Sequence, residues 1–499
     1  MKKPRYPSLY QINTRVWITD IASRIGRPAT LDDIPDNELD RLAEVGFDWI
    51  WFLSVWCTGE VAQKISRSNP EWRHDFEDTL ADLQEKDIGG SGFAITGYKV
   101  NPDLGGDDAL KRLRKRLQQR GLKLMLDFVP NHMAPDHPWV QYHPDYFVAG
   151  TVSDLEKDPQ NFTRIKKSKN DLVLAYGRDP YFSGWPDTIQ LDYSNLKTVE
   201  AMSKELLRIS DQCDGVRCDM AMLILPEVFE KTWGRSAQSF WAIITTKIRE
   251  KNPDFLFMAE VYWDMEWTLQ QQGFDYAYDK RLYDRLVERH ARLVREHFYA
   301  GLDYQDKLAR FLENHDEPRA AATFDQKTHE AAAVITFFSP GLRFFHQGQF
   351  TGRRKRISPH LVRAPHEQIN TELQKFYGSL LDLLKKSIFR NGKWSLLECV
   401  QAWEGNNTSD SFLAFGWEGT DSNRVLVSVN YSPQSGQCYV RLPFQELAEK
   451  QWKFDDLMSE ASYDREGNDL LRSGLYLDIP GWGYHVFGIK HLAKDSEGE

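Results

Sequence analysis

Cysteine is scarce in this chain, with five residues among 499. They are scattered, and no two of them form a CxxC pair: Cys57, Cys213, Cys218, Cys399 and Cys438. This distribution predicts neither a disulfide framework nor a zinc site. Scattered thiols suit a reducing compartment, so we expect a cytoplasmic protein.

Long apolar runs are also missing. No segment approaches the roughly 20 apolar residues that a membrane-spanning helix needs. Residues 1–17 (MKKPRYPSLYQINTRVW) include basic residues but lack the apolar stretch of a secretory signal. We therefore expect no membrane partner, which agrees with a cytoplasmic location.

Basic residues are fewer than acidic ones. The chain has 63 Lys and Arg and 73 Asp and Glu, which gives a formal net charge of −10. Nucleic-acid binding needs cations clustered on one face, so this balance argues against a nucleic-acid partner. The basic run at 353–356 is the exception, and we interpret it as a solvated loop. Aromatic residues are plentiful, with 16 Trp, which suits either carbohydrate stacking or a large core.

The order of the expected elements indicates an α/β protein with a (β/α)8 TIM barrel. Eight short apolar runs, several continuous enough for strands buried on both faces, alternate with helical patterns. These runs are LYQIN, FDWIWFLSVW, LKLMLDFV, DGVRC, DFLFMAEVYW, FDYAYDKRL, KLARFLENHD and LRFFHQGQ. Eight strands that alternate with helices are typical of a closed barrel with a right-handed wind.

Two departures from this alternation predict the domain organisation. An irregular segment rich in Pro, Asp and aromatics follows the third strand, so we assign 132–193 to a small inserted subdomain. Apolar and polar residues alternate between turns over 388–499, which predicts a C-terminal antiparallel β-sandwich. The barrel then comprises 1–131 and 194–387. Residues 57–107 form a long Gly-rich connection, and loops of this length are usually functional or disordered.

Arg217 and Asp219 stand at the carboxyl end of the fourth expected strand. Residues two apart in a strand face the same way, so the arginine would hold the carboxylate ionised and aimed. Such a carboxylate can attack the anomeric carbon of a sugar or stabilise the positive charge that develops there. A structural ion pair would give the same pattern, and this stretch alone does not separate the two.

Other strand ends carry acids and histidines. The third strand is followed by Asn131 and His132, the fifth by Glu260, and the seventh by His315, Asp316 and Arg319. Active sites of barrels gather at the carboxyl ends of the strands. Carboxylates that meet there raise one another's pKa, and a glycosidase needs one ionised and one protonated acid. Because Glu260 follows the most apolar segment, we expect its pKa to be raised.

Four blocks of the sequence, DFVPNH, GVRCD, FMAEVYW and ENHDEPR, resemble the motifs of the α-amylase family of retaining α-glycoside hydrolases and transglycosidases. The resemblance implies that Asp219 is the nucleophile of a glycosyl-enzyme intermediate and that Glu260 is the acid/base. It implies that Asp316 grips hydroxyls of the distorted sugar. The candidates for further substrate contacts are Phe93, Tyr98, His132, Arg217, His315 and Arg319.

The chain departs from this family in two substrate contacts. Many members carry a Lys-His pair after the nucleophile, where this chain has Met222 and Leu223. The tyrosine on which the reacting sugar stacks is matched best by Phe93, in SGFAITGY, with Tyr98 as the second candidate. Both changes affect specificity more than chemistry, and they leave room for a transglycosidase or a substrate shorter than starch.

Asn131 and Asp192 match positions that hold calcium between barrel and insert in many family members. Two oxygen donors fall short of the about six to eight ligands that calcium takes, so the sequence leaves a structural calcium open. The chemistry itself requires no cofactor.

The resemblance predicts a retaining enzyme that acts on α-glucosidic bonds of α-glucans or maltooligosaccharides. A transglycosidase acting on short α-glucosides is the alternative, because the outcome depends on whether water or a sugar hydroxyl reaches the intermediate. We expect residues 57–107, with Trp56 and Trp72, to control that acceptor. A non-catalytic barrel that binds carbohydrate or another partner is the rival hypothesis, but such a barrel would be expected to have lost one of the three acids. The sequence does not indicate the oligomeric state.

Overall fold

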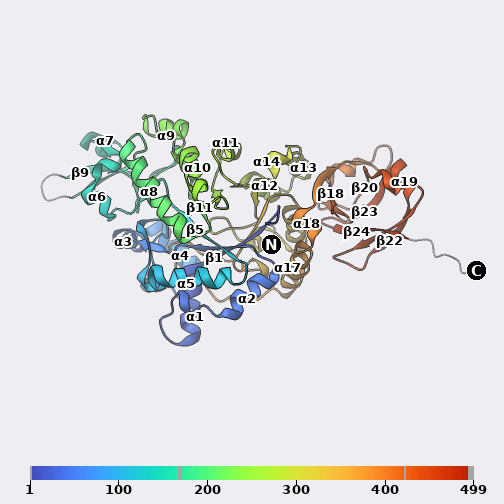
Figure 1. The fold of residues 1–499 in the computed structure, drawn as a ribbon, viewed down its shortest axis with the longest axis horizontal. Helices are drawn as coiled ribbons and strands as arrows, with labels where there is room; N and C mark the ends of the chain where they lie inside the picture. Colours follow the sequence, from blue (N-terminus) through green and yellow to red (C-terminus); the bar gives the residue numbers. More distant parts are fainter. Residues whose placement is uncertain (1–2, 167–170, 421–422, 493–499) are drawn as a thin grey trace, which may run out of the picture.

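The computed structural model describes residues 3–166, 171–420 and 423–492. Eight parallel strands close a barrel at its centre (Figure 1). In pairing order they are β1 (Ser8–Asn13), β2 (Trp49–Leu53), β5 (Lys123–Phe128), β11 (Gly215–Cys218), β12 (Leu256–Ala259), β13 (Tyr276–Tyr278), β14 (Leu308–Arg310) and β15 (Leu342–His346). Strand β15 pairs with β1 and closes the ring. The predicted (β/α)8 barrel is therefore confirmed.

Burial on both faces explains why these runs form strands. All five residues of β2 and all five of β15 are buried, since one face of each strand fills the barrel and the other lies under the outer helices. In α5 (Gly106–Gln118), Leu110, Leu113 and Leu117 are buried at helical spacing. Other helices between the strands are α2 (Asp36–Val45), α8 (Leu196–Gln212), α10 (Trp241–Lys251) and α16 (Gln326–Phe337).

The segment after β5 forms the predicted insert, which lies at the left of Figure 1 around β9 and α6. Its short elements are β6 (His132–Met133), α6 (Pro138–Tyr142), β7 (Ala149–Gly150), α7 (Val152–Lys157), β8 (Phe162–Ile165), β9 (Leu172–Ala175) and β10 (Ile189–Gln190). Strand β6 pairs with β10, so the insert leaves and rejoins the barrel at one place. His132 begins β6, four residues after the end of β5, which keeps it near that end of the barrel.

Residues 57–107 are more ordered than a Gly-rich loop, which corrects the expectation from sequence. Their main elements are β3 (Trp56–Thr58), α3 (Glu60–Ser68), α4 (Pro70–Thr79) and β4 (Ile95–Val100). Asn69 accepts hydrogen bonds from the first backbone N–H groups of α4, and Pro70 occupies the first turn. Within α4 only Phe76 is buried, so the helix carries too little apolar periodicity to be recognised from its sequence.

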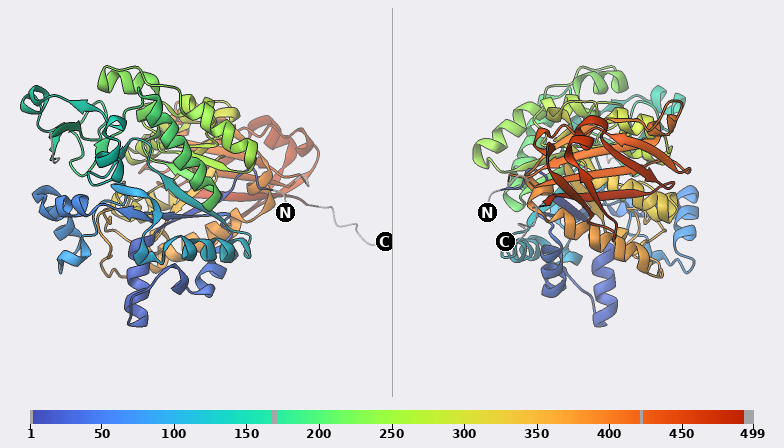
Figure 2. Two further views of the ribbon diagram at one scale, coloured as in Figure 1. Left: turned by 60° about the vertical axis from the view of Figure 1, so that its left-hand side comes forward. Right: turned by 90° about the vertical axis from the view of Figure 1, so that its right-hand side faces the viewer.

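Two antiparallel sheets form the C-terminal part of the fold (Figure 2). One contains β16 (Lys393–Leu397), β18 (Phe412–Glu418), β19 (Arg424–Asn430), β24 (Tyr484–Leu492), β21 (Gln451–Asp456) and β22 (Ser462–Glu466), and the other contains β17 (Cys399–Gln401), β20 (Gly436–Val440) and β23 (Leu475–Ile479). Phe412, Leu477 and Phe487 belong to a core shared by the two sheets, which confirms the predicted sandwich. Trp417 joins it to the barrel by donating a 2.9 Å hydrogen bond to the carbonyl of Phe338. The bounds given above for the domains stay predictions.

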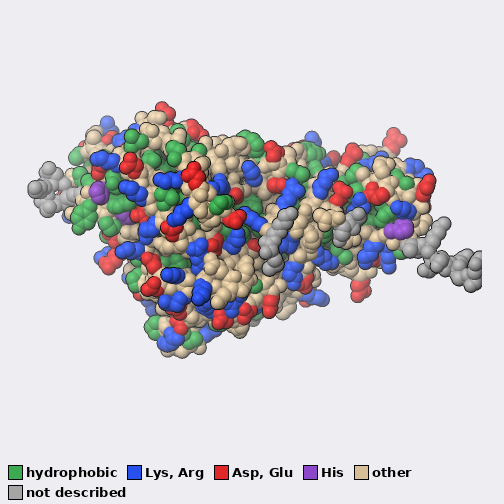
Figure 3. Space-filling model, viewed as in Figure 1, with side chains coloured by type: hydrophobic (Ala, Val, Ile, Leu, Met, Phe, Trp, Pro, Cys, Tyr) green, Lys and Arg blue, Asp and Glu red, His purple; other side chains and the backbone are tan. Residues whose placement is uncertain are grey.

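Acidic and basic side chains are interspersed on the face shown in Figure 3. All five cysteines are free. None of the helices in the described part of the chain combines the length and the apolar character needed to cross a bilayer. The cytoplasmic location stays a prediction.

Candidate active site

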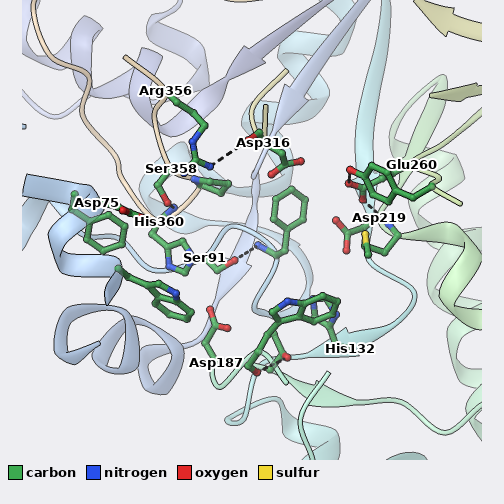
Figure 4. Close-up of a pocket in the computed structure, with 18 residues that line it drawn as sticks. Asp75, Ser91, His132, Asp187, Asp219, Glu260, Asp316, Arg356, Ser358 and His360 are labelled. Atoms are coloured by element: carbon green, nitrogen blue, oxygen red, sulfur yellow. Dashed lines mark hydrogen bonds between the residues drawn. The ribbon is translucent and has the colours of Figure 1, made fainter. Parts of the chain in front are cut away.

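Three acids from different strand ends line one cavity. Asp219 follows β11, Glu260 follows β12, and Asp316 comes shortly after β14. Since the strands are parallel, their carboxyl ends share one rim, and the cavity there has a volume of about 410 Å³ (Figure 4). The structure thus brings together the three carboxyl groups that the sequence analysis singled out.

The guanidinium of Arg217 lies among these acids. Nη1 donates a 2.6 Å hydrogen bond to Asp219 Oδ1, while Nη2 lies 2.8 Å from Glu260 Oε2 and 4.0 Å from Asp316 Oδ2. Arg217 is fully buried, and its guanidinium also lies 5.2 Å from the ring centre of Phe93. Two carboxyl groups that contact one guanidinium are close together. Retaining glycosidases place their two carboxyl groups about 5 to 5.5 Å apart.

Glu260 lies in surroundings that favour a protonated carboxyl group. Burial raises its pKa to about 8; the positive charge of Arg217 opposes this shift, and the negative charges of Asp219 and Asp316 add to it. A carboxyl group that keeps its proton near neutral pH can act as a general acid. The expected raised pKa of this residue is therefore found, with burial as its first cause.

The two oxygens of Glu260 have different neighbours. Oε2 accepts a 2.6 Å hydrogen bond from the backbone N–H of Met220 and faces Arg217, whereas Oε1 lies 2.9 Å from the hydroxyl of Tyr262. Because donors surround Oε2, the proton of the acid belongs on Oε1. Met220 is held in the left-handed region, with φ 41°, a conformation that costs energy for a non-glycine residue and is found at functional sites.

His315 connects Asp316 to the interior of the barrel. Its Nδ1 lies 2.8 Å from the amide nitrogen of Gln11, which only donates, so the ring proton is on Nε2. Nε2 lies 3.1 Å from Asp316 Oδ2. Burial lowers the pKa of His315 well below its usual value, so the ring is neutral. The side chain of Asp316 is 38% exposed, which leaves it open to a ligand in the cavity.

Phe93 and His132 line the cavity, whereas Tyr98 does not. Tyr98 is buried, and its hydroxyl donates a 2.8 Å hydrogen bond to the carbonyl of Val129, so its ring supports the end of β5 and offers no face to a sugar. Phe93 is left as the stacking candidate. The ring of His132 packs edge-on against Trp185 at 5.3 Å.

Arg319, which we expected to contact substrate, lies behind the rim. Its Nη1 pairs with buried Glu313 at 3.1 Å, and Nη2 donates to the carbonyl of Gln347 at 2.9 Å. Arg356 lines the cavity instead, and its Nη1 donates a 3.4 Å hydrogen bond to the carbonyl of Asp316. The basic run at 353–356 is therefore more than a solvated loop.

The residues that match a calcium position in the family have other partners here. The amide of Asn131 exchanges hydrogen bonds of 2.9 and 3.1 Å with the amide of Gln190. Asp192 Oδ2 accepts a 2.7 Å hydrogen bond from Arg235. An amide donor and a guanidinium in these places do not fit an ion that takes oxygen ligands. Within the described ranges, no group of three or more His, Cys, Asp or Glu is arranged to hold a metal.

Several cavity residues escaped the sequence analysis as site candidates: Asp187, Trp185 and His360. They lie in connecting segments, where no short motif marks a function, although the run GWPD in the insert was a hint. Trp72 also lines the cavity. Trp56 is buried, and its Nε1 donates a 2.8 Å hydrogen bond to the carbonyl of Asp127 in β5. Of the two tryptophans expected to contact an acceptor, only Trp72 can touch a ligand.

Comparison with known proteins gives consistent results. The chain is 23% identical over 286 residues to the α-amylase MalA of Haloarcula japonica. The aligned region covers 56% of this chain and 39% of that protein. It is 26% identical over 286 residues to the α-1,4-glucan:maltose-1-phosphate maltosyltransferase of Burkholderia pseudomallei, covering 55% of this chain and 21% of that protein. The match therefore spans less than half the length of either relative.

Solved structures share the fold at low identity. The maltogenic α-amylase AmyB of Thermotoga neapolitana superposes with a TM-score of 0.67 at 16% identity, covering 98% of this chain and 99% of that one. The α-amylase of Geobacillus thermoleovorans in complex with acarbose gives 0.67 at 17% identity, covering 99% and 100%. The model of the α-amylase catalytic domain matches residues 31–379, which is more than half of the sequence. The chain therefore belongs to the α-amylase family.

Proposed function

We propose that this protein is a retaining α-glycosidase that acts on the α-glucosidic bonds of α-glucans or maltooligosaccharides. The observation that carries the proposal is the position of Arg217, whose guanidinium contacts both Asp219 and Glu260 in one cavity. The family membership of the chain supports the same chemistry.

In the first step, an oxygen of Asp219 attacks the anomeric carbon and the glycosidic C–O bond breaks. Glu260 gives its proton to the departing oxygen and becomes a carboxylate. In the second step, water attacks the anomeric carbon, its proton passes to Glu260, and the bond to Asp219 breaks. Two displacements on the same carbon leave its configuration unchanged.

The remaining cavity residues suit the binding of the reacting sugar. Phe93 offers an apolar ring for its flat face. Asp316 and the neutral ring of His315 are 3.1 Å apart, so one hydroxyl can accept from the ring and donate to the carboxylate. His132 lies on the insert side of the cavity (Figure 4). When the sugar leaves, water can take the place of its hydroxyl in these contacts. Release therefore costs little free energy, which suits turnover.

A transglycosidase is the second candidate. One relative of this chain is named a maltosyltransferase, and transfer needs only a sugar hydroxyl in place of water in the second step. Met222 and Leu223, which replace the family's Lys-His pair, are buried. They present no charged group to the leaving sugar, so its binding differs from that in many hydrolases of the family.

Product analysis tests the proposal. The protein is incubated with maltooligosaccharides, maltose, sucrose and trehalose, with and without an added acceptor sugar. We expect at least one α-glucoside to be consumed and the first product to have the α configuration by NMR. Longer oligosaccharides formed with the acceptor would identify a transferase. Consumption of none of these compounds, or a first product of β configuration, would contradict the proposal.

A further inference from the structure

Two segments that follow the barrel strands on either side of β1 are joined into one wall of the cavity. The first, residues 60–92, follows β2, and the second, residues 353–363, follows β15; both strands flank β1 in the barrel. The segments pair through one isolated antiparallel β-bridge. Ile88 bridges Leu361, and the N–H of Gly89 donates 2.8 Å to the carbonyl of His360.

Buried side chains fix this joint. Arg15, 9% exposed, donates from one nitrogen to the carbonyl of Gly90 at 2.9 Å and from the other to the carbonyl of Pro359. Arg363 pairs with the buried carboxylate of Asp87 at 2.8 Å. An apolar cluster between the two segments consists of Phe76, Leu80, Ile88 and Leu361. A joint with its own core and buried charge contacts is part of the packed fold and stays closed in the free protein.

The cavity face of this wall is aromatic. The rings of Trp72 and His360 lie 4.6 Å apart, and Nδ1 of His360 is held 2.8 Å from the hydroxyl of Ser66. In Figure 4, His360 lies across the cavity from Glu260, with Asp316 and Ser91 between them. The wall therefore lines the side of the cavity that is remote from the acid/base.

Asp187, from the insert, lies between His360 and His132 in the same view (Figure 4). Its side chain lines the cavity and is 3% exposed. No described group forms a hydrogen bond with its Oδ2, and burial raises the pKa of this acid to about 7. A buried carboxyl oxygen without a partner is costly, and a sugar hydroxyl in the cavity would supply the missing hydrogen bond.

The proposed mechanism fixes which end of the substrate lies on each side of the cavity. The acid/base protonates the oxygen of the leaving group, so the leaving part of the substrate lies on the side of Glu260 and Tyr262. The sugar that reacts with Asp219 extends the other way, toward its non-reducing end. That is the side on which the wall stands, so Trp72 lies beside the reacting sugar and not beside the acceptor that we expected it to control. The cavity volume of about 410 Å³ lies within the roughly 300 to 1,000 Å³ typical of small-ligand pockets.

We infer that the cavity is blind on its non-reducing side, that Asp187 hydrogen-bonds a hydroxyl of the terminal sugar, and that the enzyme acts on chain ends or short α-glucosides. This inference rests on the proposed function and narrows its substrate class. Internal bonds of a long glucan would require the chain to pass through the joint of residues 60–92 and 353–363.

A pair of matched substrates tests the wall. One is an aryl maltoheptaoside with a free non-reducing end, and the other carries a cyclic acetal across O4 and O6 of that terminal glucose. Products are separated by chromatography. We expect products from the free-ended compound and none from the blocked one. Equal consumption of both, with shortened aryl fragments, would overturn the inference and leave the proposed function standing. No consumption of any α-glucoside would overturn both.

Variants of Asp187 test its proposed hydrogen bond to the terminal sugar. Asp187→Ala should raise KM for the free-ended substrate roughly 10- to 100-fold, as expected for a lost hydrogen bond to an acid, with a smaller change in kcat. Asp187→Asn should give a smaller rise, since its amide keeps an oxygen. The control is Glu156→Ala, an exposed acid of α7 in the same insert that does not line the cavity, which should leave KM unchanged. An unchanged KM in Asp187→Ala would contradict the proposed hydrogen bond between Asp187 and the terminal sugar.

Discussion

The two sides of the cavity are built in different ways. On one side, Asp219 and Glu260 follow adjacent parallel strands and share the guanidinium of Arg217. On the other, the wall of residues 60–92 and 353–363 comes from two connections that meet through their own side chains. In the function that we propose, the strand ends provide the reacting groups, and the connections limit which substrates reach them. Changes to the first side should alter kcat, whereas changes to the second should alter the choice of substrate.

The largest expected effect is on the strand-end side. Asp219→Asn removes the proposed nucleophile while keeping its shape, so kcat on an activated α-glucoside should fall by roughly 10⁴-fold or more, as for other catalytic nucleophiles. The melting temperature measures whether the fold is intact, and it should change little. A near-normal rate in this variant would show that Asp219 is not the nucleophile. It would also contradict the view that the strand-end side of the cavity determines kcat.

Glu260→Gln should have a smaller effect that depends on the leaving group. Loss of a general acid costs roughly 10²- to 10⁴-fold where the leaving oxygen needs a proton, and much less for activated aryl glucosides. The wild-type rate should fall as the pH rises through about 8, because the raised pKa of Glu260 marks where the acid loses its proton. The variant should lack this alkaline limb. Equal losses for all leaving groups would argue against the acid role.

The sequence predicted the position of a residue correctly where that residue closely follows a barrel strand. The barrel could be predicted because its strands are continuous apolar runs, and the acids because parallel strands end at one rim. Tyr98 and Arg319 were placed wrongly, since a motif does not tell whether a side chain turns toward the cavity or the core. The wall was missed because Ile88 and Leu361 are far apart in the chain, and no local pattern indicates that they meet.

The smallest expected effect concerns the attachment of the insert to the barrel. Arg235 pairs with Asp192 where many family members bind calcium. A chelator should therefore leave the melting temperature and the activity unchanged. Because Arg235 is 40% exposed, Arg235→Met should cost no more than about 1 kcal/mol of stability. A melting temperature that falls with chelator and recovers with added calcium would contradict this description of the joint.

The central claim is that Asp219 and Glu260 act on one anomeric carbon. It is tested most directly by trapping the intermediate with a fluorinated α-glucosyl fluoride, followed by mass spectrometry of the digested protein. We expect one added sugar on the peptide that contains Asp219, formed by the wild type and absent in Asp219→Asn. A label on another residue, or turnover of the substrate with no labelled protein at any time, would contradict it.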